Sequence, residues 1–317
     1  MKKLTLHLGM HRCASTTMQN LLRANRPLLA ERDIGMILRA DMEANSKLDM
    51  RAWHRRKAMD PRSWRAVERF AAAVEAMPFG HVIVSEENLL STMPGVRARS
   101  FYPFAEKFLA CLKPLSRRFD LRLRFVVRRQ DRYVESVYAF RLARGLAENF
   151  TAFLTSFPEA SFNWRKITTA LDKHDLATTS RFAVMDHWQG PELNRHLAAL
   201  VGINQDGLTL NGRGNPSLSV AHLSVLLALN RAGVMPNIVE RKATLLPMLA
   251  TMAEPNMEAV NALLSVEHRH KLKQSLEISA NLGFEGTDRD DFLALYQSAN
   301  KQFLEHASVN ADNSVWN

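Results

Sequence analysis

Along the first two thirds of this chain, the pattern of hydrophobic and polar residues alternates between one typical of strands and one typical of helices. Short apolar runs with the composition of buried strands lie at 4–8, 81–85, 121–127 and 181–185. Apolar residues at helical spacing predict helices over 14–26, 64–77, 101–115, 132–144 and 187–201. Strands that alternate with helices predict an α/β fold, in which a central parallel sheet is covered by helices on both faces.

The rest of the chain has a different pattern. Residues 41–62 are polar and predict a loop or short helices, and Pro27 is expected to end the first helix. Residues 220–306 are mostly helical in pattern, with breaks at Pro236, Pro255 and 283–286. We therefore expect an α/β core over 1–215 and a helical C-terminal extension over 216–317 that packs on this core.

Composition narrows the class of protein. The chain has 317 residues, of which 46% are hydrophobic and 23% charged, and no apolar run reaches the roughly 18 residues of a membrane helix. The start of the chain is not typical of a signal peptide, which predicts a cytoplasmic protein. Two cysteines, Cys13 and Cys111, form neither a disulfide framework nor a zinc site by themselves. No metal-ligand spacing is present, so no metal is expected.

The positive charge is concentrated in the first half. The formal net charge is +10; residues 1–150 hold 28 Lys and Arg against 15 Asp and Glu, and the remainder holds 14 against 17. A field of this sign favours anionic ligands. Nucleic acid is the other usual partner, but no zinc finger or RNA-binding aromatic signature is present, so no nucleic acid partner is expected. A generally basic surface remains an alternative interpretation.

The opening segment, LHLGMHRCASTTMQN, predicts an anion-binding turn between a strand and a helix. Backbone N–H groups at such a turn point at one spot, and the helix dipole adds partial positive charge there. Arg12 supplies a fixed cation, and Ser15, Thr16 and Thr17 supply hydroxyl groups. The alternative is a capped helix beside an incidental arginine. Cys13, at a helix start, is placed where the pKa of a thiol tends to fall.

A second polar cluster follows the strand at 121–127, in the segment VVRRQDRYVESVY. Arg128 ends the strand, and Ser136 lies eight residues later in the next helix. An arginine and a hydroxyl placed in this way can converge on one phosphate. Together with the opening turn, this cluster predicts a ligand with two separate anionic groups.

These motifs resemble the sulfotransferases that use 3′-phosphoadenosine 5′-phosphosulfate (PAPS). The phosphosulfate loop of that family reads Lys-x-Gly-Thr-Thr, and 12–16 stand in its place, with Arg12 for lysine and Ala14 for glycine. Arg128 and Ser136 match the family's 3′-phosphate motif, and RRQDRYVESVYAFRLARG is the most specific segment. The elements at 181–203 and 215–219 also resemble the family. The resemblance covers most of the chain from residue 4 to about residue 231.

The resemblance implies a P-loop-like three-layer fold and a bacterial, PAPS-dependent enzyme. It implies that PAPS is held by His11, Arg12, Cys13, Ala14, Ser15, Thr16, Thr17, Arg128 and Ser136. Arg12 would also stabilise charge on the leaving group. For the general base we favour Glu86, then Glu87 and then His54, although His54 as a solvated loop residue remains open.

Two other functions remain open. A nucleotide-dependent kinase would require a Gly-Lys-[Ser/Thr] loop, and the lysine is missing here. A catalytically lapsed protein of the same fold would keep the binding sites without the chemistry. The acceptor is expected to be a small molecule, a lipid or a saccharide with a hydroxyl or amine group, and the oligomeric state is left open.

Overall fold

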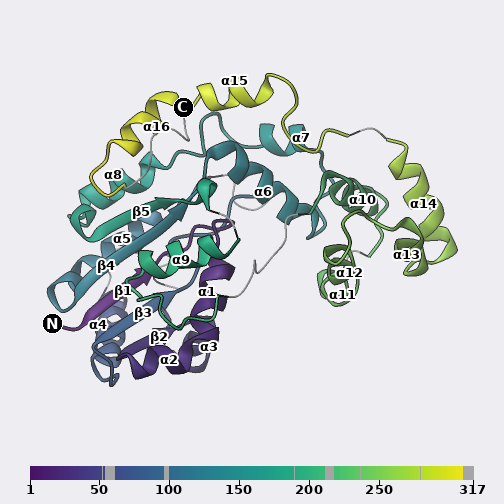
Figure 1. Cartoon of the computed structure of the whole chain (residues 1–317). Coiled ribbons are helices and arrows are strands. Elements are labelled where there is room, and N and C mark those ends of the chain that lie inside the picture. Colours follow the sequence, from purple (N-terminus) through teal and green to yellow (C-terminus); the bar gives the residue numbers. More distant parts are fainter. Residues whose placement is uncertain are drawn as a thin grey trace.

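The centre of the molecule is a five-stranded sheet in which every neighbouring pair is parallel (Figure 1). The computed structural model describes residues 1–51, 53, 61–95, 100–188, 190–210, 218–235, 237–278 and 280–309. The spatial order of the strands is β2-β3-β1-β4-β5. Their bounds are β1 Lys3–His7, β2 Ile34–Ile37, β3 His81–Ser85, β4 Asp120–Val127 and β5 Ser180–Val184. The predicted α/β class with a central parallel sheet is therefore confirmed.

The edge strand β2 was not predicted from the sequence. It has only four residues, and Gly35 in its interior removes a side chain that would have strengthened the apolar pattern. The structure explains the glycine, because a Cβ at position 35 would lie 2.3 Å from Cδ2 of Phe79. Packing against Phe79 therefore excludes the residue types by which a strand is usually predicted.

The helices cover the two faces of the sheet in a way that follows from the strand order. Connections between parallel strands are right-handed, so reversing the direction of travel across the sheet moves the helix to the other face. The chain runs from β1 to the β2 edge and then back across to β5. On one face α1 (Ser15–Ala24) packs beside α9 (Gly190–Leu200). On the other face α5 (Ala105–Leu112) packs between α4 (Pro61–Glu75) and α8 (Arg165–Lys173) (Figure 1).

The sheet is buried on both faces, as parallel sheets are in most proteins. All five residues of β3, HVIVS, are buried, and Leu4 and Leu6 of β1 have no exposed surface. The apolar run at 81–85 predicted this central strand because apolar residues without alternation are typical of a strand covered on both sides. The carboxyl ends of these strands are therefore rigidly placed.

Several helix boundaries differ from the predicted ones. The first predicted helix is two helices, because α1 ends at Ala24 and α2 (Arg26–Glu31) begins with Pro27 in its first turn. Proline is common in the first turn of a helix, because an N–H group at that position would have no partner within the helix. In the polar segment 41–62, α3 (Arg39–Ala44) is helical, and residues 52 and 54–60 lie outside the described residues.

The last third is helical, as predicted. Figure 1 shows α10 to α14 gathered at one side of the sheet, where α10 packs against α6. The helices not yet given bounds are α6 Gln130–Leu142, α7 Phe150–Thr155, α10 Val220–Arg231, α11 Ile238–Ala243, α12 Leu245–Ala250, α13 Met257–Ala262, α14 Val266–Leu276, α15 Asp288–Ala294 and α16 Gln297–Leu304.

The end of the chain returns to the α/β core. Helix α16 packs against α8, and the backbone N–H of Phe182 in β5 donates to the carbonyl of Ser308 at 2.8 Å. The predicted division of the chain at residue 215 falls outside the described residues. Among the described residues, no helix is long and apolar enough to cross a membrane.

Candidate anion-binding site

Polar side chains gather where the strands end. Arg39 lies just beyond β2, Glu86 follows β3, the turn 9–14 follows β1, Arg128 follows β4 and Asp186 follows β5. All five positions lie at one edge of the sheet because the strands are parallel. The connection after β1 covers one face and the connections after β3 and β4 cover the other, so β1 is a topological switch point. Open α/β sheets bind their ligands outside the carboxyl ends of strands at such a point.

The turn after β1 has a backbone suited to an anion. Helix α1 begins at Ser15 without a side-chain cap, so the N–H groups of its first turn point into the loop. The Ser15 hydroxyl donates to the carbonyl of Met10 at 3.0 Å, which folds the turn back on itself. Gly9 is required here, because a Cβ at that position would lie 2.5 Å from Oγ of Ser15. Thr16 is exposed and Thr17 is buried.

Two residues of this turn adopt a conformation that L side chains rarely take. The φ angle is 64° at Arg12 and 59° at Ala14, both in the left-handed region. A left-handed conformation costs a non-glycine residue about 1–2 kcal/mol. Such strain is characteristic of functional turns, where the surrounding structure holds it in place.

The two predicted anion clusters lie together. Arg12 Nε donates to Oγ of Ser136 at 3.1 Å, and Arg128 Nη1 donates to the carbonyl of Arg12 at 3.4 Å. These contacts join segments that are 124 and 116 residues apart in the chain. The opening turn and the strand-end arginine with its serine therefore form one site rather than two.

One buried N–H group of an arginine in this site has no hydrogen-bond partner. Arg128 Nε is buried without a hydrogen-bond partner, and Oδ1 of Asp186, 3.8 Å away, is also buried without one. Burial lowers the pKa of Arg12, and the charge of Arg128 lowers it further. Burial also raises the pKa of Asp186. Two guanidinium groups with only a distant carboxylate favour a bound anion, which would offset their mutual repulsion.

A buried indole holds the strand end in place. Trp164 Nε1 donates to the carbonyl of Arg128 at 3.0 Å, and Trp164 packs edge-on against Phe101 and Tyr133. On the other side, the backbone N–H of Arg129 donates to Oδ2 of Asp186 at 2.5 Å. The backbone at the end of β4 is thus held by Trp164 at the carbonyl of Arg128 and by Asp186 at the N–H of Arg129.

A cavity of about 1210 Å³ opens beside this site. Arg12, Arg128 and Ser136 form part of its lining, and Arg129, Arg132 and Arg144 add further positive charge. Helices α10, α11 and α12 contribute to the rest of the wall. The cavity therefore combines the anion site with the C-terminal helices, a combination that the sequence did not predict.

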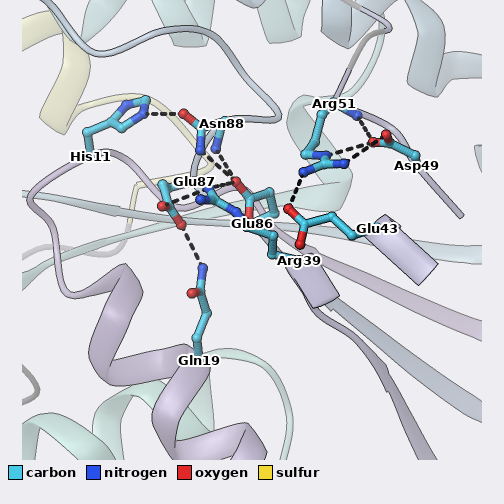
Figure 2. A network of polar contacts seen from close by, with 9 residues as sticks. All are labelled: His11, Gln19, Arg39, Glu43, Asp49, Arg51, Glu86, Glu87 and Asn88. Carbon is cyan, nitrogen blue, oxygen red and sulfur yellow. Dashed lines mark hydrogen bonds and ion pairs between the residues drawn. The ribbon is translucent and has the colours of Figure 1, made fainter. Parts of the chain in front are cut away.

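The predicted base residues lie in a separate polar network (Figure 2). Glu86 has no exposed surface, and it accepts hydrogen bonds from Arg39 and from the backbone and side chain of Asn88. Glu87 accepts from Gln19 at 2.7 Å and from Arg39 at 3.1 Å, and its side chain is 26% exposed. Neither glutamate is part of the cavity lining.

His11 connects this network with the turn. Its Nε2 lies 3.1 Å from Oδ1 of Asn88, and its backbone N–H donates to the hydroxyl of Tyr102 at 2.8 Å. Burial lowers the pKa of His11, which favours the neutral imidazole near pH 7. His11 therefore shapes the junction between the turn and the glutamates.

The expectation of a lowered thiol pKa at Cys13 is wrong, because full burial raises the pKa of Cys13 to about 12. The side chain points into the core instead of toward the uncapped helix end, so burial dominates. His54 lies outside the described residues.

Sequence reasoning missed three residues of the site. Asp186 follows the predicted strand at 181–185 just as Arg128 follows the strand at 121–127, so its position at a strand end was a usable signal. Arg39 follows the strand that was not predicted. Trp164 had no local signal, because its role depends on a contact with a carbonyl 36 residues away.

Comparisons with known proteins returned no match: no family model fits the chain, and no curated protein and no solved structure is significantly similar to it. Within the part of the chain that the structure describes, no group of three or more His, Cys, Asp or Glu side chains could hold a metal ion.

Proposed function

We propose that this protein is a sulfotransferase, which moves a sulfuryl group from PAPS to a hydroxyl or amine group of an acceptor. The observation that carries the proposal is the contact of Arg12 with Ser136 and of Arg128 with Arg12, beside the uncapped start of α1. It gives one site for two neighbouring anionic groups. The resemblance of 12–16 and of Arg128 and Ser136 to PAPS-dependent sulfotransferases supports the same assignment.

The residues present fit this ligand. The buried, unpartnered Nε of Arg128 and the hydroxyl of Ser136 suit a phosphate at the 3′ position, since a guanidinium group binds such oxygens strongly. The first turn of α1 and Arg12 suit the phosphosulfate group. The turn must hold Arg12 and Ala14 at positive φ without the family's glycine, and the structure accommodates both residues.

PAPS, when bound, supplies the sulfuryl group. In the transfer, a bond forms between the acceptor oxygen and sulfur, and the bond between sulfur and the bridging phosphate oxygen breaks. The acceptor proton goes to a base, and adenosine 3′,5′-bisphosphate leaves. Arg12 and the N–H groups of α1 would stabilise the negative charge that develops on the leaving oxygen.

Among the described residues, the candidates for the base are carboxylates, and His54 lies outside these residues. Glu86 is fully buried and bound by Arg39 and Asn88, so Glu87, which is partly exposed, is the better placed of the pair. Glu135 is a further candidate, because it lines the cavity beside Ser136. Loss of a general base lowers the turnover rate by about 10²–10⁴-fold. Single Glu→Gln variants at 86, 87 and 135 would therefore identify the base by its rate loss.

The direct test is calorimetric titration with adenosine 3′,5′-bisphosphate. We expect binding by the wild-type protein and a loss of at least about tenfold in the Arg128→Ala/Ser136→Ala variant, since one hydrogen bond to a charged group contributes about 1.5–3 kcal/mol. The matched control is Ser116→Ala/Arg117→Ala, on the 3₁₀ helix Lys113–Arg117 before β4. It removes the same groups near the opposite edge of the sheet.

The outcomes separate the functions. Equal losses in both double variants, or tighter binding of magnesium-ATP than of the 3′,5′-bisphosphate, would overturn the PAPS assignment. Binding of the bisphosphate without transfer of labelled sulfate to any of a broad panel of acceptors would favour the lapsed protein. Ala14, at positive φ in the turn, is the feature that makes this second function worth testing.

A further inference from the structure

The cavity has two chemically different walls. The core wall consists of residues from the turn after β1, the end of β4 and helix α6: Arg12, Arg128, Arg129, Arg132, Glu135, Ser136, Ala139, Phe140, Ala143 and Arg144. The helical wall consists of residues from 218 onward, and most of them are apolar: Leu218, Val220, Leu223, Ile238, Leu246, Pro247, Ala250, Ala280, Leu282 and Phe284. Lys242, Gly283, Glu285 and Arg289 complete the helical wall.

The volume of the cavity indicates that it holds more than one ligand. The cavity measures about 1210 Å³, whereas sites for single small molecules measure about 300–1,000 Å³. A nucleotide held by Arg12, Arg128 and Ser136 would lie along the core wall. The volume along the helical wall then remains for a second molecule.

The side chains of the helical wall select the chemistry of that molecule. Leu246 and Leu282 are partly buried and packed against the core, so they form a firm apolar surface. Burying an apolar group there is favourable, whereas a buried hydroxyl without a partner loses free energy. A saccharide would bring many hydroxyl groups to a wall that offers few partners. An apolar molecule with one hydroxyl group fits better.

Some of the polar groups near this wall already form ion pairs with other residues of the protein. Arg289 pairs with Asp131 and with Glu135, in the latter case at 2.7 Å, so the guanidinium group of Arg289 is already engaged by two carboxylates. On the core wall, the Phe140 ring lies 4.1 Å from the Arg144 guanidinium carbon and 5.3 Å from that of Arg12. The ring thus adds apolar surface next to the turn.

We propose that the acceptor is an apolar alcohol, with its hydrocarbon part against the helical wall and its hydroxyl group at Arg12. This inference rests on the proposed sulfotransferase function. The acceptor oxygen would form the new bond to sulfur, its proton would pass to Glu135, the candidate base that lines the cavity, and the bridging bond in PAPS would break. The C-terminal helices thus determine acceptor specificity, and the α/β core holds the donor.

The test is displacement of Nile red, an uncharged apolar dye whose fluorescence rises on binding. The competitors are 1-hexanol, 1-octanol and 1-decanol, added to the full chain in the presence of saturating adenosine 3′,5′-bisphosphate. Each buried methylene strengthens apolar binding about fourfold. We expect the concentration for half displacement to fall by up to that factor per methylene, and glucose to displace no dye.

Substitutions on the helical wall test whether the dye and the alcohol bind in the cavity. Leu246→Gln and Leu282→Gln put a polar group on the helical wall and are expected to weaken 1-decanol binding about tenfold or more. The nucleotide affinity of both variants should stay within twofold of the wild type. Val266→Gln is the matched control, because Val266 is an apolar residue of α14 that is 79% exposed and does not line the cavity.

Each outcome is decisive. If the nucleotide binds but also displaces Nile red, the helical wall holds the adenine ring and the acceptor inference is wrong, while the proposed function stands. If the nucleotide binds and chain length has no effect, or if all three variants behave alike, the inference is also wrong. If alcohols bind and the nucleotide does not, the proposed function fails, and with it the assignment of the alcohol as acceptor. Transfer of labelled sulfate from PAPS to 1-decanol would complete the support.

Discussion

Removal of one charged group, Arg39, should reveal how the glutamate network is held together. Glu86 has no exposed surface, whereas the side chain of Arg39 is 44% exposed. The two residues of this ion pair therefore differ in how much solvent each would reach if its partner were removed. In Arg39→Met, the Glu86 carboxylate stays buried and keeps only the donors of Asn88, with Oε1 of Glu86 2.7 Å from Nδ2. In Glu86→Gln, Arg39 keeps its contact with Glu87 at 3.1 Å, and the exposed part of its side chain is solvated.

The expected magnitudes differ accordingly. Breaking a buried ion pair by removing one partner costs about 3–5 kcal/mol. Arg39 is partly solvated, so we expect the lower end, a loss of about 3 kcal/mol in the free energy of unfolding of Arg39→Met. Glu86→Gln keeps the shape and one acceptor oxygen, so we expect a loss of about 1 kcal/mol. The Arg39→Met/Glu86→Leu double variant should recover part of the loss, since an apolar pair can replace a buried ion pair.

The assay is urea unfolding at pH 7, followed by circular dichroism, for the wild type, the two single variants and the double variant. A smaller loss in Arg39→Met than in Glu86→Gln would refute the reasoning, because it would mean that burial of the carboxylate is not the dominant cost. Arg26→Met is a suitable control. Arg26 pairs with Asp41 at 2.8 Å, but the two side chains are 48% and 26% exposed, so we expect a loss within about 1 kcal/mol.

Three further outcomes follow from single residues. Ala14→Gly should raise the free energy of unfolding by about 0.5–1 kcal/mol, because glycine takes the φ of 59° without strain; an equal or lower urea midpoint would contradict this. Burial lowers the pKa of His7 from 6.5 to about 4, so the unfolded chain binds more protons between these values. Stability should therefore fall by up to about 3 kcal/mol as the pH drops from 7 to 4, and His7→Asn should reduce this dependence in urea unfolding at both pH values. Cys13, with a pKa raised to about 12, should react with iodoacetamide at pH 8 only after unfolding, and mass spectrometry showing modification of the native protein would exclude the buried position.

Local pattern determined the class of the fold. Strands buried on both faces have apolar runs such as HVIVS at 81–85, and helices buried on one face have apolar residues at helical spacing. The class of the fold can therefore be predicted from these two patterns. Polar residues directly after strands then placed the turn at 9–17, the pair Glu86 and Glu87, and Arg128 at one edge, because parallel strands end on the same side. Both conclusions needed only neighbours along the chain.

Tertiary structure decided which of these groups meet. The strand order places Arg39 beside Glu86, and the packing of α6 brings Ser136 to Arg12. No local period carries such information, because each contact joins elements that the chain visits 47 or 124 residues apart. The same holds for the cavity, whose apolar wall comes from helices after residue 218. The sequence by itself determined the elements and the charges at their ends, and only the packing of distant elements determined the site that they form.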